Sequence, residues 1–139
     1  MEVGKAIYNI LSNDSDVAPL VTTGGITRIF PARFKFSQND PTLPFIVYQV
    51  VSDIPNITKN GVSTYDYVTV QITLVHSKYS DLITLSGHVR DALDYVSGTF
   101  AGVVVDKIFF ENSVESFDDT SGTNGIYQIA QDYRFNINR

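Results

Sequence analysis

The sequence predicts an α+β fold, with a mainly antiparallel sheet of four to five strands, an N-terminal helix and one longer amphipathic helix packed on one face. Three observations predict it. Residues 67–74 alternate strictly between polar and apolar side chains, which is typical of a half-buried strand. Residues 82–96 repeat apolar side chains every three or four positions, as an amphipathic helix does. Residues 102–139 form two long segments around a polar turn, and such neighbours usually pair antiparallel.

The chain should begin with a helix over residues 2–12, because its apolar side chains fall at helical spacing (Val3, Ala6, Ile7, Ile10 and Leu11). Residues 13–15 then break the pattern. Asp14 or Ser15 can cap a second turn of helix that runs to Val21. After a turn at residues 22–25, residues 26–30 form a candidate short strand.

Residues 43–51 have the composition of a central strand. The letters LPFIVYQVV are largely β-branched, aliphatic or aromatic. Phe45, Val47 and Val51 fall on one face and Ile46, Tyr48 and Val50 on the other, so this strand is expected to be covered on both sides.

The loop before this strand, residues 31–44, alternates basic and aromatic side chains at Arg33, Phe34, Lys35 and Phe36. One interpretation is an edge segment whose aromatic rings pack onto the body of the protein. The other is a loop that contacts a partner.

Residues 53–61 are rich in turn formers and end in Asn60-Gly61, a strong hairpin signal. The interval is longer than a tight hairpin needs, so it predicts a projecting β-arm or a flexible loop. Ile54, Ile57 and Lys59 on this arm are candidate interface residues.

Residues 64–76 form the clearest strand, with Val68, Val70, Ile72 and Leu74 toward a core. Their neighbours Tyr67 and Gln71 should face the opposite way. The longer helix is expected over residues 81–96, with Ser80 as its N-cap and Gly98 taking the left-handed conformation at its end.

Two strands should close the chain. In residues 102–117, simple alternation places Val104, Ile108 and Phe110 on one face, and Val103, Val105, Phe109 and Phe117 on the other. In residues 125–139, the same alternation turns Tyr133 and Phe135 inward and Arg134 outward. Tyr67, Gln71 and Arg134 therefore belong to a polar sheet face that is a candidate interface. Asp118 and Asp119 make the tip between the strands acidic.

Composition limits the possible functions. A chain of 139 residues with 43% apolar and 18% charged residues is typical of one globular domain, spanning residues 1–139. The net charge of −5 argues against general nucleic-acid binding. Without cysteine, neither a disulfide nor a thiolate metal site can form. No apolar run reaches the roughly 18–20 residues that a membrane span needs, and no signal peptide is evident, so a soluble, cytoplasmic protein is expected.

The sequence shows little that suggests catalysis. Its two histidines, His76 and His88, lack metal-ligand spacing, and no nucleophile-elbow motif occurs. We therefore expect no enzyme activity, cofactor or metal. Projecting loops on a small rigid body favour an assembly subunit.

The order of elements resembles the tail-completion, or tail-terminator, proteins of long-tailed bacteriophages. The matching segments are DVAPLV at residues 16–21, IFP at 29–31, LPFIVYQ at 43–49, the strand 67–74 followed by the helix 81–96, and YRF at 133–135. The resemblance spans nearly the whole chain, but the polar loop over residues 33–41 has no place in the family pattern.

The resemblance implies a structural virion protein of the tail or neck, assembled in the host cytoplasm. Such proteins form a ring, usually a hexamer, on the head-proximal end of the tail tube. The ring ends tube polymerisation and binds the head-completion or connector protein, while genomic DNA passes through its lumen without specific binding. It implies no membrane contact and no catalytic residue.

Two other functions remain open from the sequence. One is a different head–tail connector or a minor tail protein. The other is a small-ligand-binding or enzymatic α+β domain, for which His88 beside the apolar stripe of the helix is the sole candidate polar group.

Overall fold

The computed structural model describes residues 2–31, 43–57, 61, 64–118 and 125–139. Three helices occur in this part of the chain: α1 (Val3–Ser12), α2 (Ala18–Val21) and α3 (Tyr79–Leu93). The strands are β1 (Thr22–Thr23), β2 (Ile26–Thr27), β3 (Ile29–Pro31), β4 (Phe45–Pro55), β5 (Tyr65–His76), β6 (Gly98–Phe100), β7 (Val103–Asp118) and β8 (Ile126–Asn138). The predicted α+β class is thus confirmed.

The described strands form a six-stranded sheet in the order β3-β4-β5-β8-β7-β6, and β1 and β2 form a separate small hairpin. All neighbours in the large sheet are antiparallel except β3 and β4, which are parallel. The expectation of four to five strands was therefore too low. β3 and β6 have three residues each, which is too short to show a periodic pattern.

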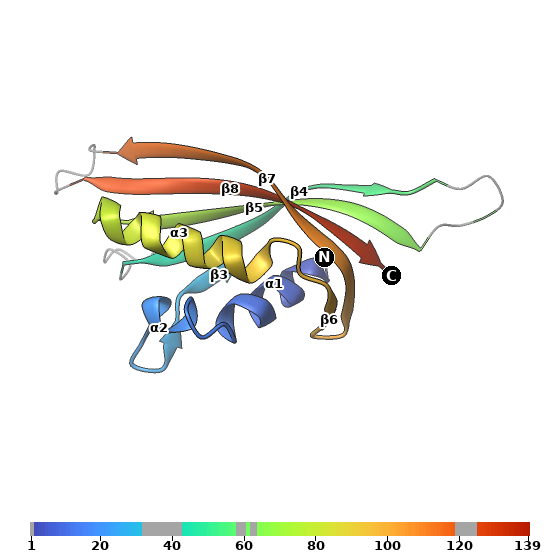
Figure 1. Cartoon of the computed structure of the whole chain (residues 1–139), viewed down its shortest axis with the longest axis horizontal. Coiled ribbons are helices and arrows are strands. Elements are labelled where there is room, and N and C mark those ends of the chain that lie inside the picture. The colour runs from blue at the N-terminus through green and yellow to red at the C-terminus, as the bar shows by residue number, and fades with distance from the viewer. Residues whose placement is uncertain (1, 32–42, 58–60, 62–63, 119–124) are drawn as a thin grey trace.

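All the helices lie on one side of the sheet (Figure 1). We call this side the covered face. Strands β5 and β8 turn their alternate apolar side chains toward it, and these are fully or almost fully buried (Val68, Val70, Ile72, Leu74, Ile129, Tyr133, Phe135 and Ile137). Helix α3 adds Leu82, Leu85, Val89 and Leu93, and α1 adds the five apolar residues of its predicted stripe. The core is thus the layer between the helices and this face.

A chain of buried polar groups joins β8 to α3 within this core. The hydroxyl of Tyr133 donates to Oε1 of Gln131 at 2.8 Å, and Nε2 of Gln131 donates to the carbonyl oxygen of Ser86 at 3.2 Å. Burial raises the pKa of the Tyr133 hydroxyl, which therefore remains a neutral donor. These bonds fix the position of the helix along the strand.

The boundaries of α3 differ from the prediction. The helix begins at Tyr79 with Lys78 at the N-cap, so Ser80 is not the cap. It ends at Leu93, and the left-handed residue that follows the helix is Tyr95, with φ 62°; Gly98, whose φ of 147° is also positive, is the first residue of β6. Backbone pairing with β7 explains the early end, because Tyr95 N–H donates to the carbonyl oxygen of Ile108 and Val96 accepts from Ile108 N–H.

Two β-bulges in β7 invalidate simple alternation on that strand. The register shifts between Val105 and Lys107 and again between Phe110 and Asn112. Each extra residue reverses the side of the sheet to which the side chains after it point. As a result Ile108 joins Val103 and Val105 in the core, whereas Phe109 turns to the other face.

The N-terminal half of the sheet also departs from expectation. Residues 26–30 do not form one strand, because Arg28 separates β2 from β3 and its carbonyl oxygen accepts the N–H of Ile46. In β4, both faces are buried at Phe45 and Ile46, as predicted. The prediction that both faces are covered is wrong farther along the strand, where Val51 lies at a bulge and is 58% exposed.

The Tyr133 hydrogen bond can be tested by the Tyr133→Phe substitution. It removes one hydroxyl and leaves Oε1 of Gln131 buried without its donor, so the free energy of unfolding should fall by about 1–2 kcal/mol. Urea unfolding followed by circular dichroism measures this change. Tyr95→Phe is the matched control, since Tyr95 is exposed, and a loss of similar size in both variants would contradict the structural role of the Tyr133 bond.

Candidate subunit and partner interface

The sheet has a second side, which we call the open face, and no described helix covers it (Figure 1). The register places Tyr67 opposite Asn136, Thr69 opposite Arg134 and Gln71 opposite Asp132. Side chains at paired positions point to the same side of a sheet. The structure therefore brings together three residues that the sequence predicted for an interface: Tyr67, Gln71 and Arg134.

Arg134 is the centre of this group. Its guanidinium carbon lies 5.0 Å from the ring centroid of Phe109 and 5.9 Å from that of Tyr67. Nε of Arg134 is buried and has no hydrogen-bond partner among the described residues. Cation–π contacts therefore hold the side chain in place.

Polar neighbours extend the group along the same face. Nε2 of Gln71 lies 3.4 Å from Oδ1 of Asp132, at the limit of hydrogen bonding. Asn136 lies opposite Lys107, and its Oδ1 is buried without a partner in the described part of the chain. Among the described residues, the two side-chain atoms that are buried without partners therefore both lie on the open face of β8.

Phe109 is a member of this group that the sequence did not assign to the interface. Its position beside Arg134 depends on the bulge between Val105 and Lys107, and nothing in the residue pattern marks that bulge. A different register would have moved this ring to the other face.

The β4–β5 hairpin projects beyond the helices at one end of the molecule (Figure 1). Ile54 and Ile57, both predicted as interface residues, are 60% and 88% exposed on this arm. Together with Val51 they give the arm three exposed β-branched aliphatic side chains. Exposed apolar side chains grouped on one projection are typical of a contact surface.

The opposite end carries an aromatic group near the start of α3. The rings of Phe117 and Tyr127 have centroids 4.6 Å apart, and those of Tyr79 and Tyr127 are 5.3 Å apart. The Tyr79 hydroxyl donates to Oε2 of Glu115 at 2.9 Å, and this bond raises the pKa of Tyr79. A surface hollow of about 360 Å³ lies among these side chains, lined also by Ser116 and Gln128.

The other predicted interface residues are not placed. Arg33, Phe34, Lys35, Phe36, Lys59 and Asp119 lie outside the described residues. Asp118 is the last residue of β7. The interface role of residues 33–36 and of Lys59, and the role of the acidic tip at Asp118 and Asp119, stay predictions.

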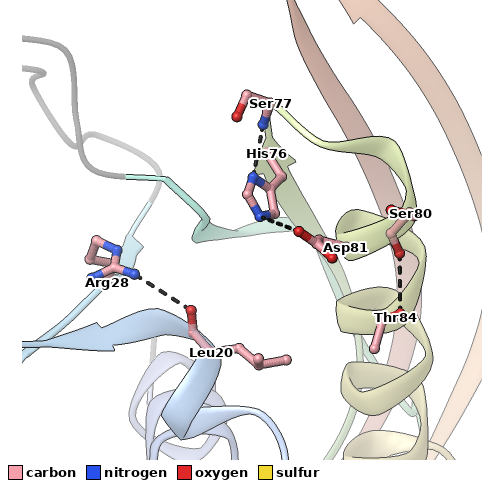
Figure 2. Close-up of polar contacts among 7 residues, drawn as sticks. All are labelled: Leu20, Arg28, His76, Ser77, Ser80, Asp81 and Thr84. Atoms are coloured by element: carbon pink, nitrogen blue, oxygen red, sulfur yellow. Dashed lines mark hydrogen bonds and ion pairs between the residues drawn. The ribbon is translucent and has the colours of Figure 1, made fainter.

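A polar corner joins α2, the β2–β3 connection and the end of β5 (Figure 2). The buried Arg28 guanidinium donates from Nε to the carbonyl oxygen of Pro44 at 2.8 Å, and from Nη1 to Oγ1 of Thr23 at 2.9 Å. Nη2 reaches the carbonyl oxygen of Leu20 at 3.5 Å. Because each contact ties a different segment to Arg28, this residue supports the fold of the corner.

His76 lies at the same corner, where Nδ1 accepts the N–H of Ser77 at 2.9 Å and Nε2 is 3.9 Å from Oδ2 of Asp81 (Figure 2). Burial lowers the pKa of His76, while Asp81 opposes this change and Lys78 and Arg28 add to it. A shallow hollow of about 230 Å³ adjoins the histidine. A single neutral imidazole of this kind is not by itself a catalytic arrangement.

The described residues include no group of three or more histidine, cysteine, aspartate or glutamate side chains close enough to hold a metal ion. No helix in the described part of the chain is both long and apolar enough to cross a membrane. The open face and the two ends therefore remain the candidate surfaces for contact with other proteins.

Comparison with known proteins gives a consistent result. Residues 5–137 match the model of the family described as "Tail completion protein gp17". A chain in the structure titled "Virion of native gene transfer agent (GTA) particle" has the same fold, with a TM-score of 0.71 and 16% sequence identity, over 99% of this chain and 95% of that one. No curated protein matches the sequence.

His76 predicts how stability depends on pH. Its pKa is lowered in the folded state, so below about pH 6.5 the unfolded chain binds a proton that the folded chain resists. The stability that neutral His76 contributes is therefore present above this pH and is lost as the pH falls. The free energy of unfolding should decrease less between pH 7.5 and 5 in His76→Gln than in the wild type.

Denaturant titrations at several pH values measure these slopes, and carboxylates common to both proteins cancel in the comparison. Asp81→Asn provides the internal control. Without the carboxylate the His76 pKa should fall further, so the slope should become steeper. The prediction would be contradicted if the free energy of unfolding changed equally with pH in the wild type, His76→Gln and Asp81→Asn.

Proposed function

Because this chain belongs to the tail completion protein gp17 family, a family of structural phage tail proteins, we propose that it forms a ring at the head-proximal end of the tail tube. The ring, which we expect to be a hexamer, ends tube polymerisation and joins the tail to the head. Genomic DNA passes through its lumen. The observation that carries this proposal is the family match over nearly the whole chain.

The surfaces of the subunit support a role in assembly. A sheet with one face covered by helices and the other open presents a broad area for contact with another molecule. The arm with Ile54 and Ile57 and the aromatic group with Tyr79 and Phe117 lie at opposite ends, so one subunit can contact two neighbours at once. This geometry suits a repeating structure.

The charge of the protein supports passage of DNA rather than its retention. The formal net charge is −5 at pH 7, and phosphate contacts of the kind that hold DNA require clustered lysine and arginine. An acidic ring would let a duplex move along its lumen. In this proposal the chain acts by binding the tail tube protein, the head-completion or connector protein and copies of itself, without catalysis.

The proposed ring is tested by the mass of the purified protein in light scattering, combined with negative-stain images. A closed species with a central hole is expected, either for the protein alone or after tail tube protein is added. When tail tube protein is present, the ring should appear at the ends of the tubes, and the tubes should stop growing. Protein that stays monomeric both alone and with tubes, and leaves tube length unchanged, would contradict the proposed function.

The arm gives a second test. Ile54→Asp combined with Ile57→Asp places two charges where aliphatic side chains are expected to be buried between subunits, so assembly should weaken at least about tenfold in the concentration required. Ile26→Asp is the matched control, because Ile26 is 65% exposed but lies on the small β1–β2 hairpin. Equal assembly of the arm variant and the control would exclude the arm from the subunit contact.

A further inference from the structure

Arg134 lacks the partner that a buried guanidinium nitrogen normally has. Nε is enclosed by the protein and donates to no described residue, and leaving such a donor unpaired costs on the order of 1–3 kcal/mol. The flanking rings of Tyr67 and Phe109 hold the side chain in place on the open face. The residue as a whole is nevertheless partly exposed, and its two Nη groups are not among the buried atoms, so a group from another molecule can approach them.

The chemistry of the missing acceptor follows from the donor. The two Nη groups of a guanidinium lie side by side, and their N–H donors match the two oxygens of a carboxylate. Aromatic rings on both sides exclude water and strengthen such a bond. A carboxylate from another molecule is thus the group that best completes this site.

The same chain displays a suitable carboxylate at its other surface. Glu115 is exposed on β7, has no cationic partner among the described residues, and is held in position by the hydroxyl of Tyr79. The rings of Phe117 and Tyr127 lie beside it, next to the hollow of about 360 Å³. This carboxylate is held by a hydrogen bond, lies beside aromatic rings and has no counter-charge within the described part of the chain.

Glu115 cannot reach Arg134 of its own chain. Glu115 is paired with Ile129, which points into the core, whereas Arg134 points to the open face. Along β8 the two positions are five residues apart, a distance of roughly 17 Å. A bond between these groups must therefore join two molecules.

We propose that the Glu115 carboxylate of one copy binds Arg134 of the next copy, so that the β7 surface around Tyr79 packs on the open face between Tyr67 and Phe109. This contact uses two different surfaces of the same chain. Such head-to-tail contacts generate rings when the rotation between copies closes. The proposal rests on the proposed ring function, which it deepens by naming the charge pair between subunits.

Charge reversal tests the pair. Arg134→Glu and Glu115→Arg should each raise the protein concentration needed for assembly by roughly thirtyfold or more, as expected when one partner of a desolvated charge pair is removed. An equal mixture of the two variants should assemble again, because every contact in an alternating ring then joins opposite charges. Light scattering and negative-stain images, with tail tube protein present if the wild type requires it, provide the measurement.

Two control variants change charge outside the proposed contact. Lys5→Glu changes an exposed charge on α1, on the covered side of the sheet, and Glu111→Arg changes one on the same strand as Glu115; both should assemble as the wild type does. Arg134→Gln, which removes the charge with a smaller change of shape, should weaken assembly even if Arg134→Glu fails to fold. Circular dichroism establishes which variants are folded.

The outcomes separate the two proposals. If the wild type assembles and the folded Arg134 variants assemble equally well, the pairing is wrong while the ring function stands. Failure of the mixture to recover, with both single variants folded, also overturns the pairing of Glu115 with Arg134. If the wild type itself never assembles, alone or with tubes, the ring function fails and the pairing fails with it.

Discussion

The structure depends on a sheet that is covered on one face only. Side chains of β5 and β8 alternate between the helical layer and the open face, and α1 and α3 provide the apolar surface that buries the inner set. Burial of this layer supplies the main stabilisation of the fold. The bonds from Tyr133 through Gln131 to Ser86 add directional contacts between α3 and β8. Everything on the open face is positioned by this arrangement.

Local periodicity was sufficient for the central part of the fold. The stripe of α1, the alternation of β5 and the alternation of β8 each depend on side chains a few positions apart, and the structure confirms all three. The same reasoning placed Tyr67, Gln71 and Arg134 on one face. It succeeded because β5 and β8 pair along twelve positions without a register shift.

The features of the fold that the sequence did not predict have a different cause. The bulges in β7, the left-handed Tyr95 and the short strands β3 and β6 all arise from pairing between distant segments. Such pairing has no signature in the residues concerned, since a bulge moves one residue out of register without changing the composition of the strand. Phe109 was therefore missed beside Arg134, although Arg134 itself was found.

Arg134 Nε and Asn136 Oδ1 are buried and have no partner among the described residues. A buried polar atom without a partner lowers the free energy of unfolding of the isolated subunit. Apolar replacements of similar shape would remove that cost, so the folding of one subunit alone does not account for these groups. In the proposed ring, a carboxylate of the next copy would bind the accessible part of Arg134 and so offset part of this cost. The same reasoning applies to Ile54 and Ile57, whose exposure is unfavourable in a monomer and favourable in a complex. In the proposed ring, the open face and the arm are therefore the surfaces that contact neighbouring molecules.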